Sequence, residues 1–329
     1  EKEREVQGHT SQFSYKVVAE FVNENGLPFK AELSKNFKTE KEAQAFLEDC
    51  KGSDFTISRL DKKPGKRSPA GPFTTSTLQQ EASRKLGFNT QRTMRVAQKL
   101  YEGIELPGEG NVGLISYMRT DSVTLADTAV TEIRDLIGER YGSKNVPDAP
   151  RQFKNKSKNA QEAHEAIRPT SVAYVPEDIK DALDSDQLKL YSLIWKRTMA
   201  CQMVPAVFDT VAIEMAAGDV AQGNLLRANG SVLVEPGFMA VYQEGRDDAK
   251  DDDGDRLLPE ISEGDTIKLE ELRPEQHFTE PPPRFTEASL VKTLEEYGIG
   301  RPSTYANIIA TLKNREYVEM DAKRFIPTD

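Results

Sequence analysis

The sequence predicts a multidomain α+β protein in which a mostly helical domain is inserted into a β-rich domain. Strand-like alternation of apolar and polar residues occurs near the start of the chain, over residues 13–33, and returns after Pro205. Helical periodicity dominates residues 77–204, between these two β regions. A chain of 329 residues is long enough for two or three domains that each bury a core of their own.

The first β region contains a predicted hairpin, a helix and a further strand. Residues 13–22 and 27–33 alternate in polarity and flank an Asn-Gly dipeptide, which is typical of tight hairpin turns. Thr39 is placed to cap a short helix that ends at residue 50. A strand is expected over residues 54–63.

A Gly- and Pro-rich segment, residues 63–73, predicts a loop at the boundary to the helical region. A short apolar strand is expected over 112–118, and Thr124 with Asp127 suits a capping box before the next helix. Pro169 is expected to stop one of the helices. The helices of this region are predicted at 76–86, 90–103, 124–137, 159–168 and 185–203, with Met94, Ala97, Leu100 and Tyr101 on one face of the second.

Strands return over residues 208–217, 223–237 and 264–273, with an acidic loop between the last two of them. The segment from 281 onward outlines two helices joined by a Gly/Pro turn and followed by a strand, which resembles a helix-turn-helix or winged helix. We therefore expect the following domains: a discontinuous β-rich domain of residues 1–76 and 205–275, an inserted helical domain of residues 77–204, and a partial helical domain of residues 276–329.

Composition excludes some classes of protein and leaves nucleic-acid binding open. The sequence has no run of 18 apolar residues, so a membrane span is not expected. Cys50 and Cys201 lie far apart, which argues against a disulfide framework and a zinc site. The net charge is −10, but residues 59–102 hold ten Lys and Arg against three acids, whereas 244–255 hold seven acids against two bases. Phosphate binding depends on local potential, so the basic stretch is either a phosphate-binding surface or a solvated charged face.

The stretch "LISYMRTDS", residues 114–122, combines residue types that suit phosphoryl transfer. A phenol is a poor nucleophile at neutral pH unless neighbouring cations stabilise the phenolate and the transition state. In a strand, Arg119 would share a face with Tyr117, and its guanidinium matches the geometry of phosphate oxygens. Asp121 and Ser122 would cap the helix that follows. Taken by themselves, these residues leave open whether Tyr117 is a nucleophile or a packing aromatic at a strand end.

Three separated stretches, in order along the chain, resemble signatures of the type IA DNA topoisomerases, and the bacterial topoisomerase I branch fits best. "LISYMRTDS" is similar to the active-site signature of that family, whose tyrosine opens one DNA strand by transesterification. The second and third stretches are "QEAHEAIRPT", residues 161–170, and "PPPRFTEASLVKTLEEYGIGRPSTYA", residues 281–306. "GPFTTSTLQQEASRKLGF" and "LYSLIWKRTMACQM" extend the resemblance over nearly the whole chain.

The resemblance implies roles for individual residues. Tyr117 matches the nucleophile that becomes linked to a 5′-phosphate, and Arg119 matches the arginine that contacts the scissile phosphate. His164 matches a histidine near that phosphate, with a hydrogen-bonded structural histidine as the alternative. Arg168 is either a phosphate contact or a structural ion-pair partner.

A second group of implied DNA-binding residues lies in the Gly/Pro turn near the end of the chain. Arg301, with Ser303 and Thr304 behind it, suits binding of a backbone phosphate at a helix N-terminus. For Ser303 a simple N-cap is the alternative, and both roles are compatible.

The family also carries an N-terminal Toprim domain whose acidic cluster holds Mg²⁺, and nothing before Tyr117 resembles that domain. We therefore expect a core fragment of the longer enzyme, without the Toprim domain and without C-terminal zinc ribbons. Mg²⁺ is expected as a cofactor of the intact enzyme only, and no metal-binding residues are expected in this chain.

The implied function is cleavage of one DNA strand through a 5′-phosphotyrosine, strand passage and resealing without ATP. The expected partner is single-stranded or negatively supercoiled DNA. We expect the protein to be a monomer. We expect it in the bacterial cytoplasm, associated with the nucleoid and not with a membrane. The chain alone is expected to bind single-stranded DNA weakly and not to relax plasmids. The alternatives are a non-catalytic single-stranded DNA-binding module and an enzyme like the tyrosine recombinases or type IB topoisomerases, which attach to a 3′-phosphate.

Overall fold

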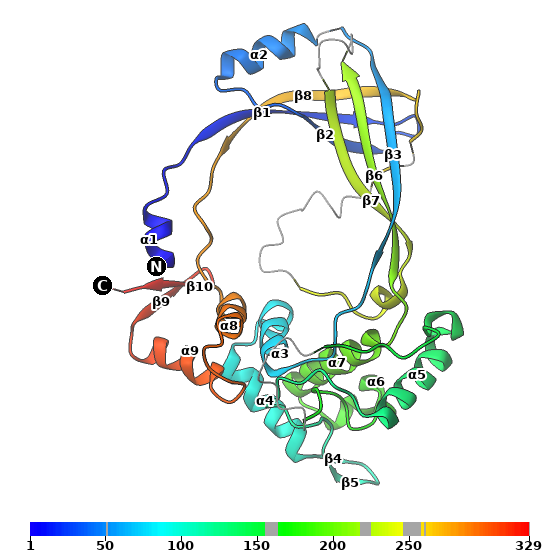
Figure 1. Cartoon of the computed structure of the whole chain (residues 1–329), viewed down its shortest axis with the longest axis vertical. Coiled ribbons are helices and arrows are strands. Elements are labelled where there is room, and N and C mark those ends of the chain that lie inside the picture. Colours follow the sequence, from blue (N-terminus) through cyan, green and yellow to red (C-terminus); the bar gives the residue numbers. More distant parts are fainter. Residues whose placement is uncertain (51, 155–163, 218–224, 246–257, 260, 329) are drawn as a thin grey trace. The chain divides into compact units, whose positions relative to one another are not determined.

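The computed structural model describes residues 1–50, 52–154, 164–217, 225–245, 258–259 and 261–328. The chain divides into two compact units, and Figure 1 shows the elements of each. The β unit comprises residues 1–66, 207–235 and 249–283, and the helical unit comprises residues 67–206, 236–248 and 284–329. Residues 67–206 and 236–248 of the helical unit lie between segments of the β unit in sequence, and residues 284–329 follow its last segment.

The β unit is built around a closed antiparallel barrel, in the order β1-β2-β7-β6-β3-β8. Strand β8 closes the ring by pairing with β1 over nearly the full length of both. The strands are β1 Phe13–Val22, β2 Pro28–Leu33, β3 Phe55–Arg67, β6 Ala206–Ala217, β7 Leu225–Glu235 and β8 Thr266–Phe278. The predicted hairpin of the first two strands is confirmed, with Gly26 at φ +74° in its turn.

The barrel core follows from the alternation that predicted the strands. Val17, Ala19 and Phe21 of β1 point inward and are fully buried. The ring of Phe21 lies 5.6 Å from that of Phe29 and 5.2 Å from that of Phe55. Helix α2, Glu40–Asp49, contributes apolar side chains to the same core and begins with the predicted Thr39 cap, here a complete capping box. A short exposed helix, α1, Lys2–Gln7, precedes β1.

Strand β3 is longer than the sequence predicted. Residues 63–67, expected to be loop because of the Pro64-Gly65 dipeptide, continue the strand to Arg67. Strand β6 lies beside β3 in the barrel, and the Gly65 backbone faces Phe208 and Thr210 of β6. Pairing with a neighbouring strand therefore outweighs the local turn signal of this dipeptide.

The helical unit is organised around helix α7, Ser185–Cys201, whose Leu190, Tyr191, Ile194 and Trp195 are buried. Asp184 caps this helix with a complete capping box. The other elements are α3 Thr75–Glu81, the π-helical η1 Ala82–Leu86, α4 Thr90–Glu102, β4 Ile104–Leu106, β5 Gly110–Val112, α5 Asp127–Tyr141, η2 Ser143–Asn145, α6 Pro176–Ile179, η3 Lys180–Ala182 and η5 Gly237–Ala240.

Residues 284–329 group with the helical unit and have a small core of their own. Helices α8, Glu287–Glu296, and α9, Tyr305–Asn314, precede a hairpin of β9, Val318–Asp321, and β10, Arg324–Pro327. The predicted order of two helices, a Gly/Pro turn and a strand is confirmed. The boundaries of three separate domains stay a prediction.

Three local predictions around the motif are wrong. The expected strand over 112–118 ends at Val112, and residues 114–122 are irregular apart from a single bridge between Ile115 and Pro169. Helix α5 has Ala126 as its N-cap and no side-chain cap, so the Thr124–Asp127 capping box does not form. Of the helix expected over 159–168, residues 164–168 are not helical and carry one isolated bridge at Ile167, and 159–163 lie outside the described residues.

Within the described ranges, no helix combines the length and the apolar character needed to cross a membrane. Cys50 and Cys201 are buried free thiols in different units. Burial raises the pKa of Cys201 to about 12, so this thiol stays protonated at neutral pH.

Candidate active site

Tyr117 lies at the surface of the helical unit on a backbone that is held from both sides. The hydroxyl of Thr75, in the first turn of α3, donates to the Met118 carbonyl at 2.6 Å. The backbones of Thr75 and Thr120 are also joined, because Thr75 N donates to Thr120 O at 2.9 Å and Thr120 N donates to Thr75 Oγ1 at 2.9 Å. Met118 is fully buried, whereas the Tyr117 side chain is 40% exposed. The segment is thus anchored through its neighbours while the phenol reaches solvent.

The described part of the second predicted signature, residues 164–170, runs alongside the first without forming a helix, and we call it the strap. Ser116 holds the strap most directly: its amide donates to Arg168 O at 2.8 Å and its hydroxyl donates to Ala166 O at 2.7 Å. The same hydroxyl accepts from Arg168 N at 2.9 Å. Thr170 N adds a bond of 3.0 Å to Leu114 O. Two motifs about fifty residues apart in sequence are therefore joined by backbone hydrogen bonds and by the Ser116 side chain.

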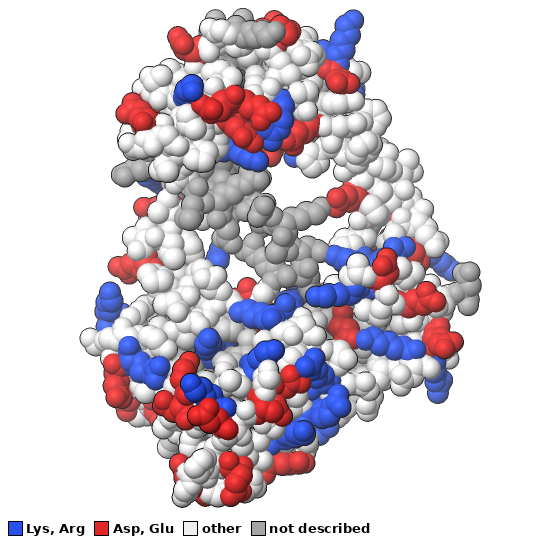
Figure 2. Space-filling view, turned by 180° about the vertical axis from the view of Figure 1, so that it is seen from behind, with Lys and Arg blue, Asp and Glu red and all other residues white. Residues whose placement is uncertain are grey.

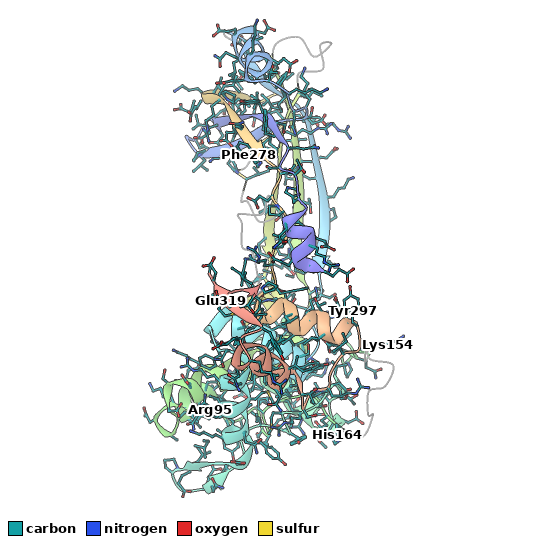
Figure 3. The ribbon with its side chains drawn as sticks, turned by 90° about the vertical axis from the view of Figure 1, so that its left-hand side faces the viewer. Arg95, Lys154, His164, Phe278, Tyr297 and Glu319 are labelled. Carbon is teal, nitrogen blue, oxygen red and sulfur yellow. The ribbon has the colours of Figure 1, made fainter. Side chains whose placement is uncertain are left out.

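This pairing brings His164 next to Tyr117. The two ring centroids are 6.5 Å apart, and the rings are tilted by 40°. His164 is exposed, and Figure 3 shows its side chain at the surface of the helical unit. The strap and the motif segment thus present two of the predicted site residues side by side.

Arg119 and Tyr117 both contact the last turn of helix α4. Arg119 Nη1 donates to Gln98 Oε1 at 3.5 Å, and Gln98 Nε2 donates in turn to Glu102 Oε1 at 2.6 Å. The ring of Tyr101, on the same turn, meets that of Tyr117 edge to face with centroids 5.4 Å apart. The prediction that Tyr117 and Arg119 share one face of a strand is wrong, because residues 114–122 do not form a strand. Both side chains instead contact the last turn of α4.

Arg168 is engaged with protein groups. Its Nη2 donates to Glu165 Oε1 at 3.1 Å, its Nε donates to the other oxygen of the same carboxylate, and its Nη1 donates to Pro169 O at 2.9 Å. The hydrogen bond from Arg168, followed by the charge of that residue, lowers the pKa of Glu165. Of the two roles left open by the sequence, these contacts favour the structural ion pair.

The third predicted group lies in the turn before α9. Arg301 is exposed, and its amide donates to Thr304 Oγ1 at 2.8 Å. Thr304, not Ser303, is the N-cap residue of α9, so the simple capping role proposed for Ser303 is wrong. The hydroxyl of Thr304 closes the turn by donating to Arg301 O at 3.2 Å, and Ser303 is exposed beside it.

Two observations connect this turn with the motif segment. Ser76 of α3 donates to Glu295 Oε2 at 2.7 Å, which ties α8 to the helix that carries Thr75. Burial is the main cause that raises the pKa of Tyr305 to about 12, and the negative charge of Glu295 comes next. The charge of Asp121 adds to this rise, whereas the charge of Arg301 acts against it. Asp121 belongs to the motif, so the first turn of α9 lies within electrostatic reach of it.

Sequence reasoning missed several residues that build the site. The sequence does not single out Thr75, Ser116 or Gln98, and it groups Tyr101 with Met94, Ala97 and Leu100 on one helix face, although Tyr101 is 41% exposed. The available signal was weak: Gln98 and Tyr101 recur at helical spacing on the border between the apolar stripe and the polar face of α4. Thr75 and Ser116 act through backbone groups distant in sequence, which local patterns do not reveal.

The predicted basic stretch, residues 59–102, is divided between the two units. Residues 59–66 belong to the β unit and the remainder to the helical unit. Several of its cations pair with acids, as Arg59 does with Asp61 at 2.9 Å and Arg92 with Asp186 at 2.7 Å. Figure 2 likewise shows Lys and Arg mixed with Asp and Glu on the visible face of the helical unit. The acidic run over 244–255 lies mainly outside the described residues.

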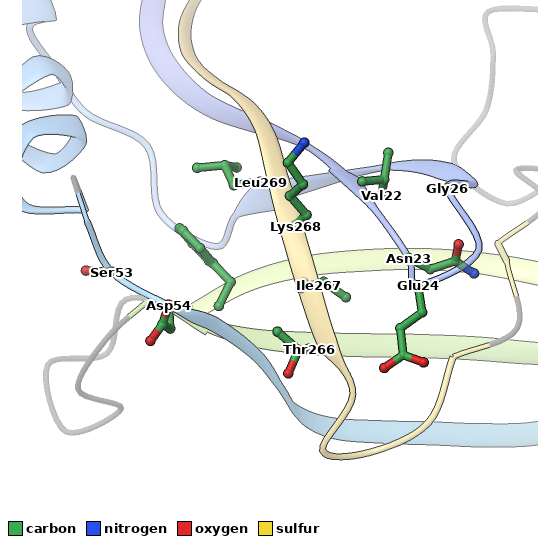
Figure 4. A pocket seen from close by; sticks show the side chains of 11 residues that line it. Val22, Asn23, Glu24, Gly26, Ser53, Asp54, Thr266, Ile267, Lys268 and Leu269 are labelled. Atoms are coloured by element: carbon green, nitrogen blue, oxygen red, sulfur yellow. The ribbon is translucent and has the colours of Figure 1, made fainter.

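Neither a metal centre nor the clearest hollow coincides with the predicted site. Among the described residues, no group of three or more His, Cys, Asp or Glu is arranged to hold a metal ion. A hollow of about 520 Å³ opens in the β unit near Glu24, Asp54 and Lys268 (Figure 4). Side chains of both charges line this hollow, and its residues lie far in sequence from the three signature stretches. We therefore assign it no role in the chemistry considered below.

Comparisons with known proteins agree with the resemblance seen in the sequence. A family model described as DNA topoisomerase matches residues 1–329. A DNA topoisomerase 1 of Rickettsia bellii is 48% identical over all of this chain and 42% of its own length, and one of Xylella fastidiosa is 51% identical over 94% of this chain and 38% of its own length.

Full-length topoisomerase I from Thermotoga maritima has a similar solved structure, with a TM-score of 0.81 and 33% identity over 99% of this chain and 51% of that one. The chain thus spans about two fifths of the length of the curated relatives it matches and about half of the solved one. Matches of this extent and identity show that the chain belongs to the DNA topoisomerase family, in its bacterial type IA branch.

Proposed function

We propose that this chain supplies the nucleophilic half of a type IA topoisomerase site, with Tyr117 as the nucleophile. The observation that carries the proposal is the setting of this phenol: it is exposed on a backbone fixed by Thr75 and Ser116, next to Arg119 and His164. A fixed, solvent-facing nucleophile near permanent positive charge is what phosphoryl transfer requires.

In the proposed reaction the Tyr117 oxygen attacks the phosphorus of a phosphodiester in single-stranded DNA. The new bond joins the Tyr117 oxygen to the 5′-phosphate of the downstream fragment, and the bond from phosphorus to the 3′ oxygen of the upstream fragment breaks. The phenol loses its proton and the 3′ oxygen takes one up, leaving a 3′-hydroxyl. Because the phosphotyrosine keeps the energy of the diester, the reverse attack by that hydroxyl reseals the strand without ATP.

Arg119 is proposed to stabilise the negative charge on the phosphoryl oxygens. Within the described part of the chain, its guanidinium makes a single 3.5 Å bond to Gln98, so most of its donors are available to a phosphate. His164 is proposed as a second contact to the same phosphate. For Arg168 we propose an indirect role, in which its pair with Glu165 keeps the strap in place.

Arg301, Ser303 and Thr304 are proposed to bind the DNA backbone away from the scissile phosphate. The exposed guanidinium of Arg301 and the exposed hydroxyl of Ser303 flank the turn, while Thr304 fixes its shape. Contacts of this kind fix the position of the strand without reading its sequence.

At the level of whole domains, we propose that the β unit acts as an arch that moves during strand passage. The helical unit would carry the tyrosine in a winged-helix-like fold, and residues 276–329 would form part of a helix-turn-helix base. The intact enzyme is proposed to act as a monomer in the cytoplasm on negatively supercoiled DNA. Mg²⁺ is proposed to be held by a Toprim domain outside this chain, and no step above depends on it.

The test uses a protein of the relatives' full length that contains this chain, with Tyr117→Phe as the variant. An oligonucleotide labelled at either end is incubated with each protein and the covalent adduct is mapped. We expect an adduct on the 5′-phosphate side with Tyr117 and none with the variant. An adduct on a 3′-phosphate would favour the recombinase or type IB alternative. Unchanged relaxation by Tyr117→Phe would favour a non-catalytic DNA-binding module.

A further inference from the structure

The connector from the β unit into the helical unit, residues 67–75, is bonded directly to both segments of the candidate site. Phe73 O accepts from Ile167 N, in the strap, at 2.8 Å. Thr75 bonds to Met118 and Thr120, the two residues on either side of Arg119 in sequence. Any displacement of this connector would therefore reach the backbone around Tyr117 and His164 within a few hydrogen bonds.

Arg197, on helix α7, clamps the connector immediately upstream of these contacts. Its side chain is 5% exposed, its Nε donates to Gly71 O at 2.6 Å, and its guanidinium lies 4.7 Å from the centre of the Phe73 ring. The backbone at Gly71 and the ring at Phe73 are thus held by one cation that comes from the centre of the helical unit.

The same guanidinium also holds the segment that follows β7. Arg197 Nη1 donates to Glu244 Oε1 at 2.8 Å and to Tyr242 Oη at 3.4 Å. The Tyr242 hydroxyl donates to the buried carboxylate of Glu81, which also accepts from Gly245 N at 3.1 Å. Two of the places where the chain passes between units are therefore fixed to one buried cluster.

Burying an arginine costs desolvation free energy that burying an apolar residue does not. A charged side chain in a low-dielectric interior is destabilising unless its donors are satisfied, and an apolar residue of similar volume often serves packing equally well. An apolar residue, however, has no donors with which to hold the Gly71 carbonyl and the Glu244 carboxylate at once. The contacts of Arg197 therefore point to a mechanical role beyond packing.

We propose that Arg197 is a positioning residue that isolates the active site from movements of the β unit. By fixing Gly71 and Phe73 to α7, it stops a displacement of the connector before it reaches Thr75, Met118 and the strap. The inference rests on the proposed function, in which the β unit moves while Tyr117 and Arg119 keep their geometry.

The test is hydrogen–deuterium exchange on this chain without DNA, so that it does not depend on catalysis. In Arg197→Met we expect the amides of Thr75, Thr120 and Ile167 to exchange at least about tenfold faster than in the parent chain, because the connector becomes free to open locally. The amide of Leu290, bonded to Thr286 O in α8, is expected to keep its rate. Arg197→Lys, which retains charge but not the forked donors, is expected to show an intermediate effect.

The matched control is Ile137→Ala, which creates a cavity in α5 without touching the connector. A purely structural role for Arg197 predicts that both variants accelerate exchange uniformly across the helical unit, including Leu290. That outcome, or unchanged exchange at Thr75 and Ile167 in Arg197→Met, would overturn the proposal.

If Arg197→Met does not fold, Glu244→Gln removes the charge from one half-exposed partner and leaves the packing intact. We then expect the amide of Ile167 alone to exchange about two- to threefold faster. An unchanged exchange rate at that amide would also overturn the proposal. A failure of the proposed function shows instead in the Tyr117 adduct test, where Tyr117→Phe would have no effect while the exchange pattern of the Arg197 variants would remain.

Discussion

At the scale of single residues, Ser116 shows how the nucleophile is held in place by groups that carry no chemistry themselves. Its hydroxyl donates to Ala166 O and accepts from Arg168 N, and its amide donates to Arg168 O. These bonds fix the strap that bears His164 relative to the segment that bears Tyr117. A side chain of this size sits beside the tyrosine without covering it.

Replacing this hydroxyl is expected to loosen the strap. In Ser116→Ala two side-chain hydrogen bonds are lost, so we expect the free energy of unfolding of the helical unit to fall by about 1–3 kcal/mol. Urea denaturation followed by tryptophan fluorescence measures the change, since Trp195 lies in that unit. The control, Ser143→Ala at an exposed site, is expected to stay within about 0.5 kcal/mol.

The contact between Gln98 and Arg119 leads to a prediction about the reaction. Gln98→Leu removes the acceptor of the 3.5 Å bond and leaves Glu102 without its 2.6 Å donor. In the full-length protein we expect adduct formation at Tyr117 to slow by about tenfold, with oligonucleotide affinity within about twofold, because Arg119 loses its orientation but not its charge. Gln91→Leu, exposed at the start of the same helix, is the control; an equal loss there would contradict the prediction.

The pair between Glu165 and Arg168 predicts a dependence of stability on pH. The pKa of Glu165 is lowered in the folded chain from its ordinary value of 4.5, first through its hydrogen bond with Arg168. Its stabilising contribution is therefore complete above 4.5 and is lost as the pH falls through the lower, folded value. The difference in unfolding free energy between the parent chain and Glu165→Gln should be constant from pH 6 to 7, roughly, and shrink in acid. A difference in unfolding free energy that stays constant into acid would show that the ion pair does not make stability depend on pH.

At the scale of secondary-structure elements, the predictions from sequence succeeded where the signal is local. The Asn-Gly hairpin, the Thr39 capping box and the apolar stripe of α7 depend on residues within a few positions of one another. Such signals survive folding because the groups that satisfy the backbone are supplied by the segment itself.

The predictions failed where distant segments supply the hydrogen bonds. Residues 113–118 have the composition of a strand, but their hydrogen-bond partners are Thr75, Leu100 and the strap instead of a neighbouring strand. The strap was expected to belong to a helix over 159–168, yet Ala166 and Ile167 donate to Thr124 and Phe73, some forty and ninety residues away. The signatures could therefore suggest which residues belong to the candidate site, but they could not give its geometry.

The entry into η5 shows how tightly one element is set against another. Gly237 has φ +47°, and a Cβ there would lie 2.4 Å from Pro205 O, a backbone atom. Gly237→Ala is expected to destabilise the helical unit by about 3 kcal/mol or more, since the clash adds to the strain of a left-handed backbone. Gly142→Ala, with φ +88° and no atom within 4 Å of the added Cβ, is expected to cost about 1–2 kcal/mol. Equal losses in thermal or urea denaturation would argue against the clash.

At the scale of the whole molecule, the net charge does not favour nucleic-acid binding, so any binding depends on where the cations lie. The net charge is −10, and the basic stretch is divided between two units. Binding of single-stranded DNA by this chain is therefore expected to be weak and to depend on a few exposed cations. Arg301, in the turn before α9, is the clearest of these on its position beside Ser303 and Thr304.

Salt titration of oligonucleotide binding tests this expectation. For Arg301→Gln we expect weaker binding and a slope of log affinity against log salt that is smaller by about 1, since one phosphate contact is lost. Arg59→Gln, whose guanidinium pairs with Asp61 in the β unit, is the control and is expected to leave the slope unchanged. Equal effects of the two changes would indicate non-specific attraction without a defined path for the strand.

The closed ring of strands in the β unit bears on how the protein behaves at high concentration. Each of the six strands has a neighbour on both sides, which reduces the length of strand edge to which another molecule could add. The closure is uneven, because β2 pairs with β7 only through Glu32 and Leu33, so within the described residues β7 beyond Arg227 pairs with β6 alone. That part of β7 exposes the apolar side chains of Val232, Leu233 and Val234. If the protein self-associates through strands at high concentration, this one-sided stretch of β7 is where we expect a second molecule to add.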